Sequence, residues 1–194
     1  MKPVDDGLPV LHFETQAALE AWLDEHHESA DGVWLRFAKK GSGQKSVTYD
    51  EAVELGLCFG WIDGQSRSLD DTFWLQRFTP RRKRSKWSKL NCEKALELIR
   101  QGRMRPAGLA AVDAAKADGR WDAAYASPKN IEVPEDLQRR LDENPKAKAF
   151  FETLSGSNRY AILYRIHDAK KPETRERRIE KFVGMLERGE KIYG

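Results

Sequence analysis

The sequence predicts an α+β protein: a small, mostly antiparallel sheet with flanking helices, followed by a helical C-terminal region packed on it. Two observations support this prediction. Strand-like segments are confined to the first part of the chain, at residues 10–13, 32–38, 60–68 and 72–78. From residue 134 onward, the apolar residues recur at the spacing of amphipathic helices.

Two helices of the first part have clear start signals. Thr15 precedes a helix whose apolar stripe consists of Leu19, Trp22, Leu23 and His26. Thr48 and Glu51 fit a capping box, in which the threonine side chain accepts from the Glu51 amide and the glutamate accepts from the Thr48 amide. We therefore expect a second helix that begins at Thr48 and ends near Phe59.

The two later strand-like segments predict a β-hairpin. Only residues 69–71 separate Gly60–Ser68 from Thr72–Phe78. Pro80 ends the second strand, because proline has no amide hydrogen to donate to a sheet. Two further helices are expected over residues 87–100 and 105–118.

The chain divides into three regions. Residues 1–118 form the α+β domain, and residues 119–133, which lack periodicity and contain Gly, Pro and Asn, form a linker. Residues 134–194 form the helical region, with helices expected over 135–143, 145–154, 158–168 and 172–188. Because these helices are few and polar, we expect them to dock on the first domain as part of one compact unit.

The composition favours a folded cytoplasmic protein without a membrane span. Six Trp, eight Phe and five Tyr supply large side chains to bury. No apolar run is long enough to cross a membrane, and residues 1–6 lack the apolar segment of a secretory signal. Cys58 and Cys92 lie in apolar or helical contexts, where we expect small buried side chains rather than a disulfide.

The positive charge is concentrated in one segment. The net charge is +3, and residues 80–90 contain six basic and no acidic side chains, against 28 basic and 31 acidic ones elsewhere. This basic run lies between a predicted strand and a predicted helix, where phosphates or nucleic acid are attracted. A solvated loop, or pairing with Asp63, Asp70 and Asp71, explains the same pattern. Its candidate anion-binding residues are Arg81, Arg82, Lys83, Arg84, Lys86 and Lys89.

The segment Phe59–Gly64 is the sharpest candidate for a specific contact. Two glycines flank Trp61 and Asp63, so the backbone can approach a ligand while the indole offers a stacking face and the carboxylate an acceptor. The structural alternative places Trp61 in the core and pairs Asp63 with a turn or with Arg67. A third segment, Lys39–Lys45, is glycine-rich and basic but lacks the order of a phosphate-binding P-loop.

Catalytic and metal-binding motifs are not evident. The four histidines and two cysteines form no zinc-ligand spacing, and no Gly-x-Ser-x-Gly sequence occurs. We therefore expect no metal, no cofactor and no assigned catalytic residue, and we favour a protein that is not an enzyme.

Four segments together resemble a known family: Trp34–Tyr49, Leu57–Gly64, Arg77–Asn91 and Lys170–Arg178. The chain resembles, over nearly its whole length, the YdeI/OmpD-associated, or bacteriocin-protection, family of small bacterial proteins. The resemblance implies a stress-response role in tolerance of bacteriocins and cationic antimicrobial peptides and a link to an outer-membrane porin, but no reaction. The matching residues are candidate ligand contacts: Lys40, Trp61, Asp63, Gly64, Arg77, Arg84, Trp87 and Asn91.

Three functional hypotheses follow. In the first, the protein binds a small anionic or amphipathic ligand or a protein partner, and Trp61 and Trp87 face one shared cleft together with the basic run. In the second, residues 81–89 contact the phosphates of a nucleic acid. In the third, the protein is an enzyme of unrecognised type with Asp63 as acid or base.

Overall fold

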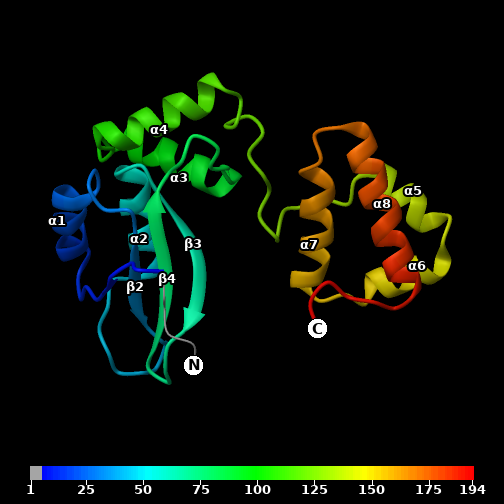
Figure 1. Ribbon diagram of the computed structural model, residues 1–194, viewed down its shortest axis with the longest axis horizontal. Coiled ribbons are helices and arrows are strands. Elements are labelled where there is room, and N and C mark those ends of the chain that lie inside the picture. The colour runs from blue at the N-terminus through cyan, green and yellow to red at the C-terminus, as the bar shows by residue number, and fades with distance from the viewer. Residues whose placement is uncertain (1–5) are drawn as a thin grey trace. The chain divides into compact units, whose positions relative to one another are not determined.

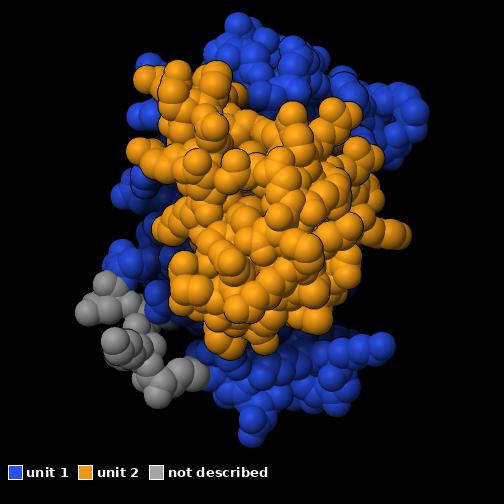
Figure 2. Space-filling view, turned by 90° about the vertical axis from the view of Figure 1, so that its right-hand side faces the viewer, with its two compact units in different colours: residues 1–87, 91–123 blue, residues 88–90, 124–194 orange. Residues whose placement is uncertain are grey.

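The computed structural model of the protein describes residues 6–194 (Figure 1). The chain forms two compact units, coloured separately in Figure 2. Unit 1 extends to Trp87 and includes Asn91–Ala123, whereas unit 2 contains Ser88–Leu90 and Ala124–Gly194. The boundary after Ala123 falls inside the predicted linker. The expectation of no secretory signal falls on residues 1–6, and residues 1–5 lie outside the described part of the chain.

Unit 1 contains the sheet. Its four strands are β1 (Val10–Leu11), β2 (Val33–Ala38), β3 (Trp61–Ser68) and β4 (Phe73–Pro80), arranged in the order β1-β2-β4-β3. β1 is parallel to β2, and the other two pairs are antiparallel. The predicted α+β class and the β3–β4 hairpin are therefore confirmed.

Four helices accompany the sheet: α1 (Gln16–His26), α2 (Tyr49–Cys58), α3 (Lys89–Arg100) and α4 (Pro106–Ala117). Thr15 caps α1, and Thr48 and Glu51 form the complete capping box expected for α2. α4 packs closely on the end of α2, because a Cβ atom at Gly108 would lie only 2.2 Å from the Cys58 carbonyl oxygen.

The two faces of the sheet differ in their surroundings. Phe78 faces α2, since a Cβ atom at Gly56 would lie 3.4 Å from its ring. Side chains alternate along a strand, so the neighbours of Phe78 point to the opposite side. That opposite side carries three arginines with three apolar residues, and we call it the arginine face: Trp34, Arg36, Arg67, Phe73, Leu75 and Arg77.

Unit 2 consists largely of four helices: α5 (Glu135–Asp142), α6 (Pro145–Glu152), α7 (Gly156–His167) and α8 (Pro172–Glu187). These helices enclose their own hydrophobic cluster, in which Leu137, Ile162 and Leu186 are fully buried. Asn158 fixes the C-terminal tail, because its side chain accepts from the Tyr193 amide at 2.9 Å and donates to the Tyr193 carbonyl at 3.1 Å. The helical C-terminal region was thus predicted correctly.

Two further expectations concern the cysteines and membrane-spanning segments. Cys58 and Cys92 are both free and buried, and burial raises the pKa of each thiol to about 11. No helix within residues 6–194 combines the length and apolar character needed to cross a membrane.

Candidate functional site

The loop between β2 and α2 borders a cavity of about 550 Å³ in unit 1, which we call the loop cavity. Both ends of this loop are fixed to the sheet region. The Lys39 amide donates to the Thr72 carbonyl at 2.7 Å, and the Val47 amide donates to the Phe13 carbonyl at 2.8 Å. Between these anchors, Gly41 and Gly43 have φ values of 83° and 72°, which turn the chain around the cavity.

Three aromatic side chains form one wall of the loop cavity. Phe37 and Trp74, paired across β2 and β4, stack with ring centroids 4.9 Å apart. Tyr49, the first residue of α2, lies 6.0 Å from the Trp74 ring and 6.3 Å from the Phe37 ring. The antiparallel register and the capping box of α2 therefore place these rings together, where they offer an apolar surface to a ligand.

The rim of the loop cavity is mainly positively charged. Lys39, Lys40, Lys45 and the single acidic side chain Glu14 line it. Lys39 is engaged, because its ammonium group donates to the Asp70 carbonyl at 2.6 Å. Lys40 and Lys45 are exposed and form no ion pair with any carboxylate in the described part of the chain. Their ammonium groups are therefore available to an anion above the aromatic wall.

Asp63 is connected to this cavity through Tyr49. The Tyr49 hydroxyl donates to Oδ2 of the half-buried Asp63 at 2.7 Å. Gly64 is exposed on β3, and its backbone carbonyl accepts from the side-chain amide of the buried Gln76 at 2.8 Å. The carboxylate of Asp63 thus orients an aromatic residue of the cavity wall.

Trp61 does not offer a stacking face to a ligand. Its side chain is 1% exposed, and its indole N–H donates to the His27 carbonyl at 3.1 Å. The ring packs edge-on against Trp22 of α1 at 5.9 Å. Gly60, with φ 73°, permits close packing on α4, since a Cβ atom there would lie 2.8 Å from the Ala107 carbonyl oxygen. Of the two alternatives for Trp61, the structure therefore has the one that places it in the core, because α1 covers this face of the sheet.

Trp87 is also buried, at 1% exposure. The Arg81 guanidinium lies 3.7 Å above its ring, and Trp121 packs beside it at 5.0 Å. Because Trp61 and Trp87 are each enclosed by different neighbours, the expected shared cleft between them does not exist.

The basic run forms a tight turn after β4. The Arg82 amide donates to the Ser85 hydroxyl, and the Ser85 amide returns a bond to the Arg82 carbonyl, both at 2.9 Å. The side chains of Arg82, Lys83 and Arg84 project from this turn and are exposed, and Lys86 is exposed after it. This turn therefore gathers three of the candidate cations on one surface.

The remaining candidates lie elsewhere. Arg77 is on the arginine face, where its Nε lies 3.6 Å from Asp6. Lys89 belongs to unit 2, and its backbone amide donates to the Tyr125 carbonyl at 2.9 Å. Asn91 lies on α3. Asp70 caps the hairpin turn, and hydrogen bonds from the Phe73 and Thr72 amides hold its pKa below the ordinary value.

Among the residues of the loop cavity, only Lys40 was a candidate ligand contact in the sequence analysis. Lys45 lies in the glycine-rich segment Lys39–Lys45 that was also considered, whereas the three aromatic residues Phe37, Tyr49 and Trp74 were not candidates. The hairpin prediction contained a usable signal, because pairing the second hairpin strand with 32–38 sets Phe37 opposite Trp74.

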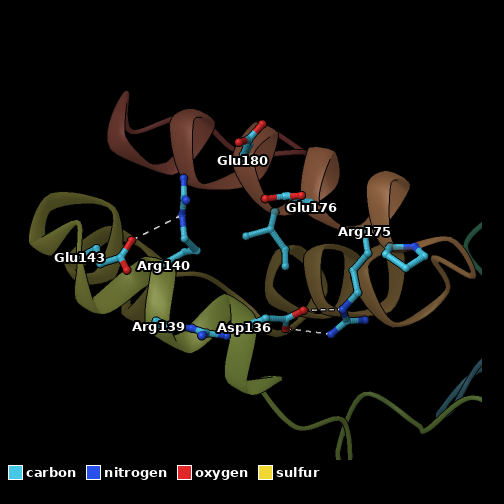
Figure 3. A pocket seen from close by; sticks show the side chains of 9 residues that line it. Asp136, Arg139, Arg140, Glu143, Arg175, Glu176 and Glu180 are labelled. Atoms are coloured by element: carbon cyan, nitrogen blue, oxygen red, sulfur yellow. Dashed lines mark hydrogen bonds and ion pairs between the residues drawn. The ribbon is translucent and has the colours of Figure 1, made fainter.

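Unit 2 contains a second cavity, of about 440 Å³, between α5 and α8 (Figure 3). Arg175 spans it with two hydrogen bonds to Asp136, at 2.5 and 2.9 Å. On α5, Arg140 lies 3.7 Å from Glu143, while Glu176 and Glu180 project from α8 (Figure 3). This cavity is lined by both signs of charge and by the buried Ile179.

The fold and the loop cavity define a class of two-unit protein: an α+β domain with a cationic, aromatic-lined cavity, followed by a four-helix region. Residues 11–111, just over half of the chain, match the family Domain of unknown function (DUF8412), so the chain belongs to that family. Residues 130–189 match the model of the family Bacteriocin-protection, YdeI or OmpD-Associated. Three of the four segments that carried the resemblance lie in the first of these regions, and Lys170–Arg178 lies in the second.

One curated relative is similar to part of the chain. It is the "Uncharacterized protein YdeI" of Bacillus subtilis (strain 168), which is 44% identical over 57 residues. The aligned region covers 28% of this chain and 29% of the relative, so the chain matches less than a third of that protein. No solved structure matches the chain.

Proposed function

We propose that this protein binds a small anionic ligand with a flat apolar part in the loop cavity, and that this binding serves tolerance of bacteriocins and cationic antimicrobial peptides in the cytoplasm. The observation that carries the proposal is the loop cavity itself, which joins an aromatic wall to two unpaired ammonium groups within the described residues.

The cavity supports both parts of the ligand's chemistry. Burying a flat ring against Phe37, Tyr49 and Trp74 is favourable, because it removes apolar surface from water. Lys40 and Lys45 supply opposite charge at the rim, so a carboxylate, sulfonate or phosphate is favoured there. The volume of about 550 Å³ is within the range of small-molecule sites.

The physiological part of the proposal is supported by the family name matched by residues 130–189. That name describes protection from bacteriocins and assigns no reaction. We therefore propose a binding protein and place no catalytic step at the cavity.

Replacing the two rim lysines tests the binding site. We expect Lys40→Ala with Lys45→Ala to weaken binding of the fluorescent aromatic anion anilinonaphthalene sulfonate about tenfold, since two exposed charge contacts contribute roughly 1 kcal/mol or less each. Lys40→Arg with Lys45→Arg keeps both charges and should retain binding. Removing Lys146 and Lys191, two exposed lysines of unit 2, is the matched control.

A loss of equal size in the control pair, or unchanged binding in the rim variant, contradicts the proposed site. The biological part is tested separately in a bacterial strain that lacks the protein. Expression of the unaltered chain should restore bacteriocin tolerance, and the rim variant should restore less of it. Equal restoration by both would separate tolerance from the cavity.

A further inference from the structure

The arginine face lies opposite the side of the sheet that packs on α1 and α2. Arg36 and Arg67 both pair with Leu75 in the strand register, one from each side of β4. Arg77 is two residues further along β4, and alternate residues of a strand point to the same side about 6.8 Å apart. Three guanidinium groups therefore share one face.

Aromatic rings hold two of these guanidiniums in place. Arg36 lies 4.5 Å above the Phe73 ring, and Arg67 lies 5.1 Å from the Trp34 ring. Neither arginine forms an ion pair with a carboxylate among residues 6–194. Because the rings restrict the long side chains, less conformational entropy is lost when a ligand binds them.

The cations continue beyond the end of the strand. β4 ends at Pro80, and the amide of the next residue, Arg81, donates to the Gly60 carbonyl at 2.9 Å, which fixes the start of the basic turn. Arg82, Lys83 and Arg84 project from that turn. From Leu75 to Arg82 the chain spans about 20–25 Å at the rise of an extended strand.

We propose that the arginine face and the basic turn form a binding surface for an extended single-stranded nucleic acid. Each guanidinium group can donate two parallel hydrogen bonds to the oxygens of one phosphate, and its flat cationic face can stack on a base. Cations that lie across three neighbouring strands and recur in the turn after β4 fit a flexible polyanion, and the salt-dependent phosphate contacts supply its affinity. This surface uses the side of the sheet opposite Phe37 and Trp74, so it does not depend on the loop cavity.

Asp6 places one negative charge on the arginine face. Its carboxylate accepts from the Trp34 indole at 3.0 Å and lies 3.6 Å from Arg77, so it contacts two residues of the arginine face. A negative charge there repels a polyanion. Asp6→Asn keeps an acceptor for the indole and removes the charge, so it should tighten binding two- to threefold.

The test is fluorescence anisotropy with a labelled oligouridylate of about 12 nucleotides, titrated between about 50 and 200 mM salt. For the unaltered chain, the logarithm of affinity should fall linearly with the logarithm of salt concentration. Arg36→Gln with Arg67→Gln should reduce the magnitude of that slope by about 1.4, since each phosphate contact on a single strand contributes about 0.7. Arg36→Lys with Arg67→Lys should preserve the slope but weaken binding, because the planar groups are lost.

The matched control is Arg100→Gln with Arg139→Gln, two exposed arginines that belong neither to the arginine face nor to the basic turn. It should leave the slope unchanged, and circular dichroism should show that all variants are folded. No binding at the lowest salt, an equal loss in the control, or weaker binding by Asp6→Asn would each overturn the proposal. Displacement of the oligonucleotide by polyglutamate or anionic vesicles at equal charge would also overturn it, in favour of a protein or membrane surface.

Discussion

Arg175 joins α8 to α5 by binding the Asp136 carboxylate with two nitrogen atoms. Hydrogen bonding from the Arg175 side chain, opposed by partial burial, holds the pKa of Asp136 below its usual value. A carboxyl group with a depressed folded-state pKa stabilises the fold above its unfolded pKa, and this contribution is lost as the pH falls through the folded-state pKa. The pair therefore stabilises unit 2 at neutral pH.

Asp136→Asn should lower the free energy of unfolding by about 1 kcal/mol at neutral pH, a value reduced for the partial exposure of both side chains. Chemical denaturation at several pH values measures this change in the free energy of unfolding. The difference from the unaltered chain should shrink as the pH falls below about 4, where the unfolded aspartate protonates. Glu173→Gln, at an exposed position in the first turn of α8, is the control. A difference that stays constant down to acidic pH would contradict the ion-pair explanation.

At the scale of elements, α4 and α2 meet at a glycine. A Cβ atom at Gly108 would lie 2.2 Å from the Cys58 carbonyl oxygen and 2.5 Å from that of Leu57. Both atoms belong to the backbone at the end of α2, so they cannot rotate away. The approach of the two helices therefore requires glycine at this position.

Gly108→Ala should destabilise unit 1 by about 3 kcal/mol or more, because the helices must separate to accept the methyl group. Thermal denaturation followed by circular dichroism measures the change. Gly156→Ala, in the first turn of α7, is the contrasting variant, since nothing lies within 4 Å of its Cβ position. It should be neutral or stabilising by up to about 1 kcal/mol. Similar losses in both variants would show that helix packing is not the cause.

The elements were more accessible to sequence reasoning than the site. The Thr48–Glu51 capping box depends on residues three positions apart, so local chemistry was sufficient to predict it. The exposure of Trp61 depends instead on which face of the sheet α1 covers, and no local pattern contains that information. Lys45, Tyr49 and Trp74 converge only after the loop closes on the sheet, so the cavity required the structure.

At the scale of the whole molecule, unit 2 has a hydrophobic cluster made of its own residues. The sequence predicts that the helical region docks on the α+β domain as one compact unit, and this remains a prediction. The chain offers a simple way to test it, because all six tryptophans belong to unit 1. Tryptophan fluorescence therefore reports the unfolding of unit 1 alone.

Ile162→Ala removes a fully buried side chain from the cluster of unit 2 and should cost about 2–5 kcal/mol there. If the units unfold as one, the tryptophan fluorescence transition should move to lower denaturant together with the circular dichroism transition. A fluorescence transition that stays in place while the helical signal shifts would contradict the predicted docking. Gly156→Ala can again serve as the reference for a unit 2 substitution without loss of packing.

The two buried thiols have a practical consequence for labelling. With a pKa of about 11, only about one molecule in ten thousand carries a Cys58 or Cys92 thiolate at neutral pH. Exposed thiolates attack the double bond of a maleimide, so a cysteine introduced at the exposed Gln44 should react far ahead of the native pair. A fluorophore attached there would lie on the loop between β2 and α2 and report occupancy of the loop cavity, and the native cysteines could remain in place.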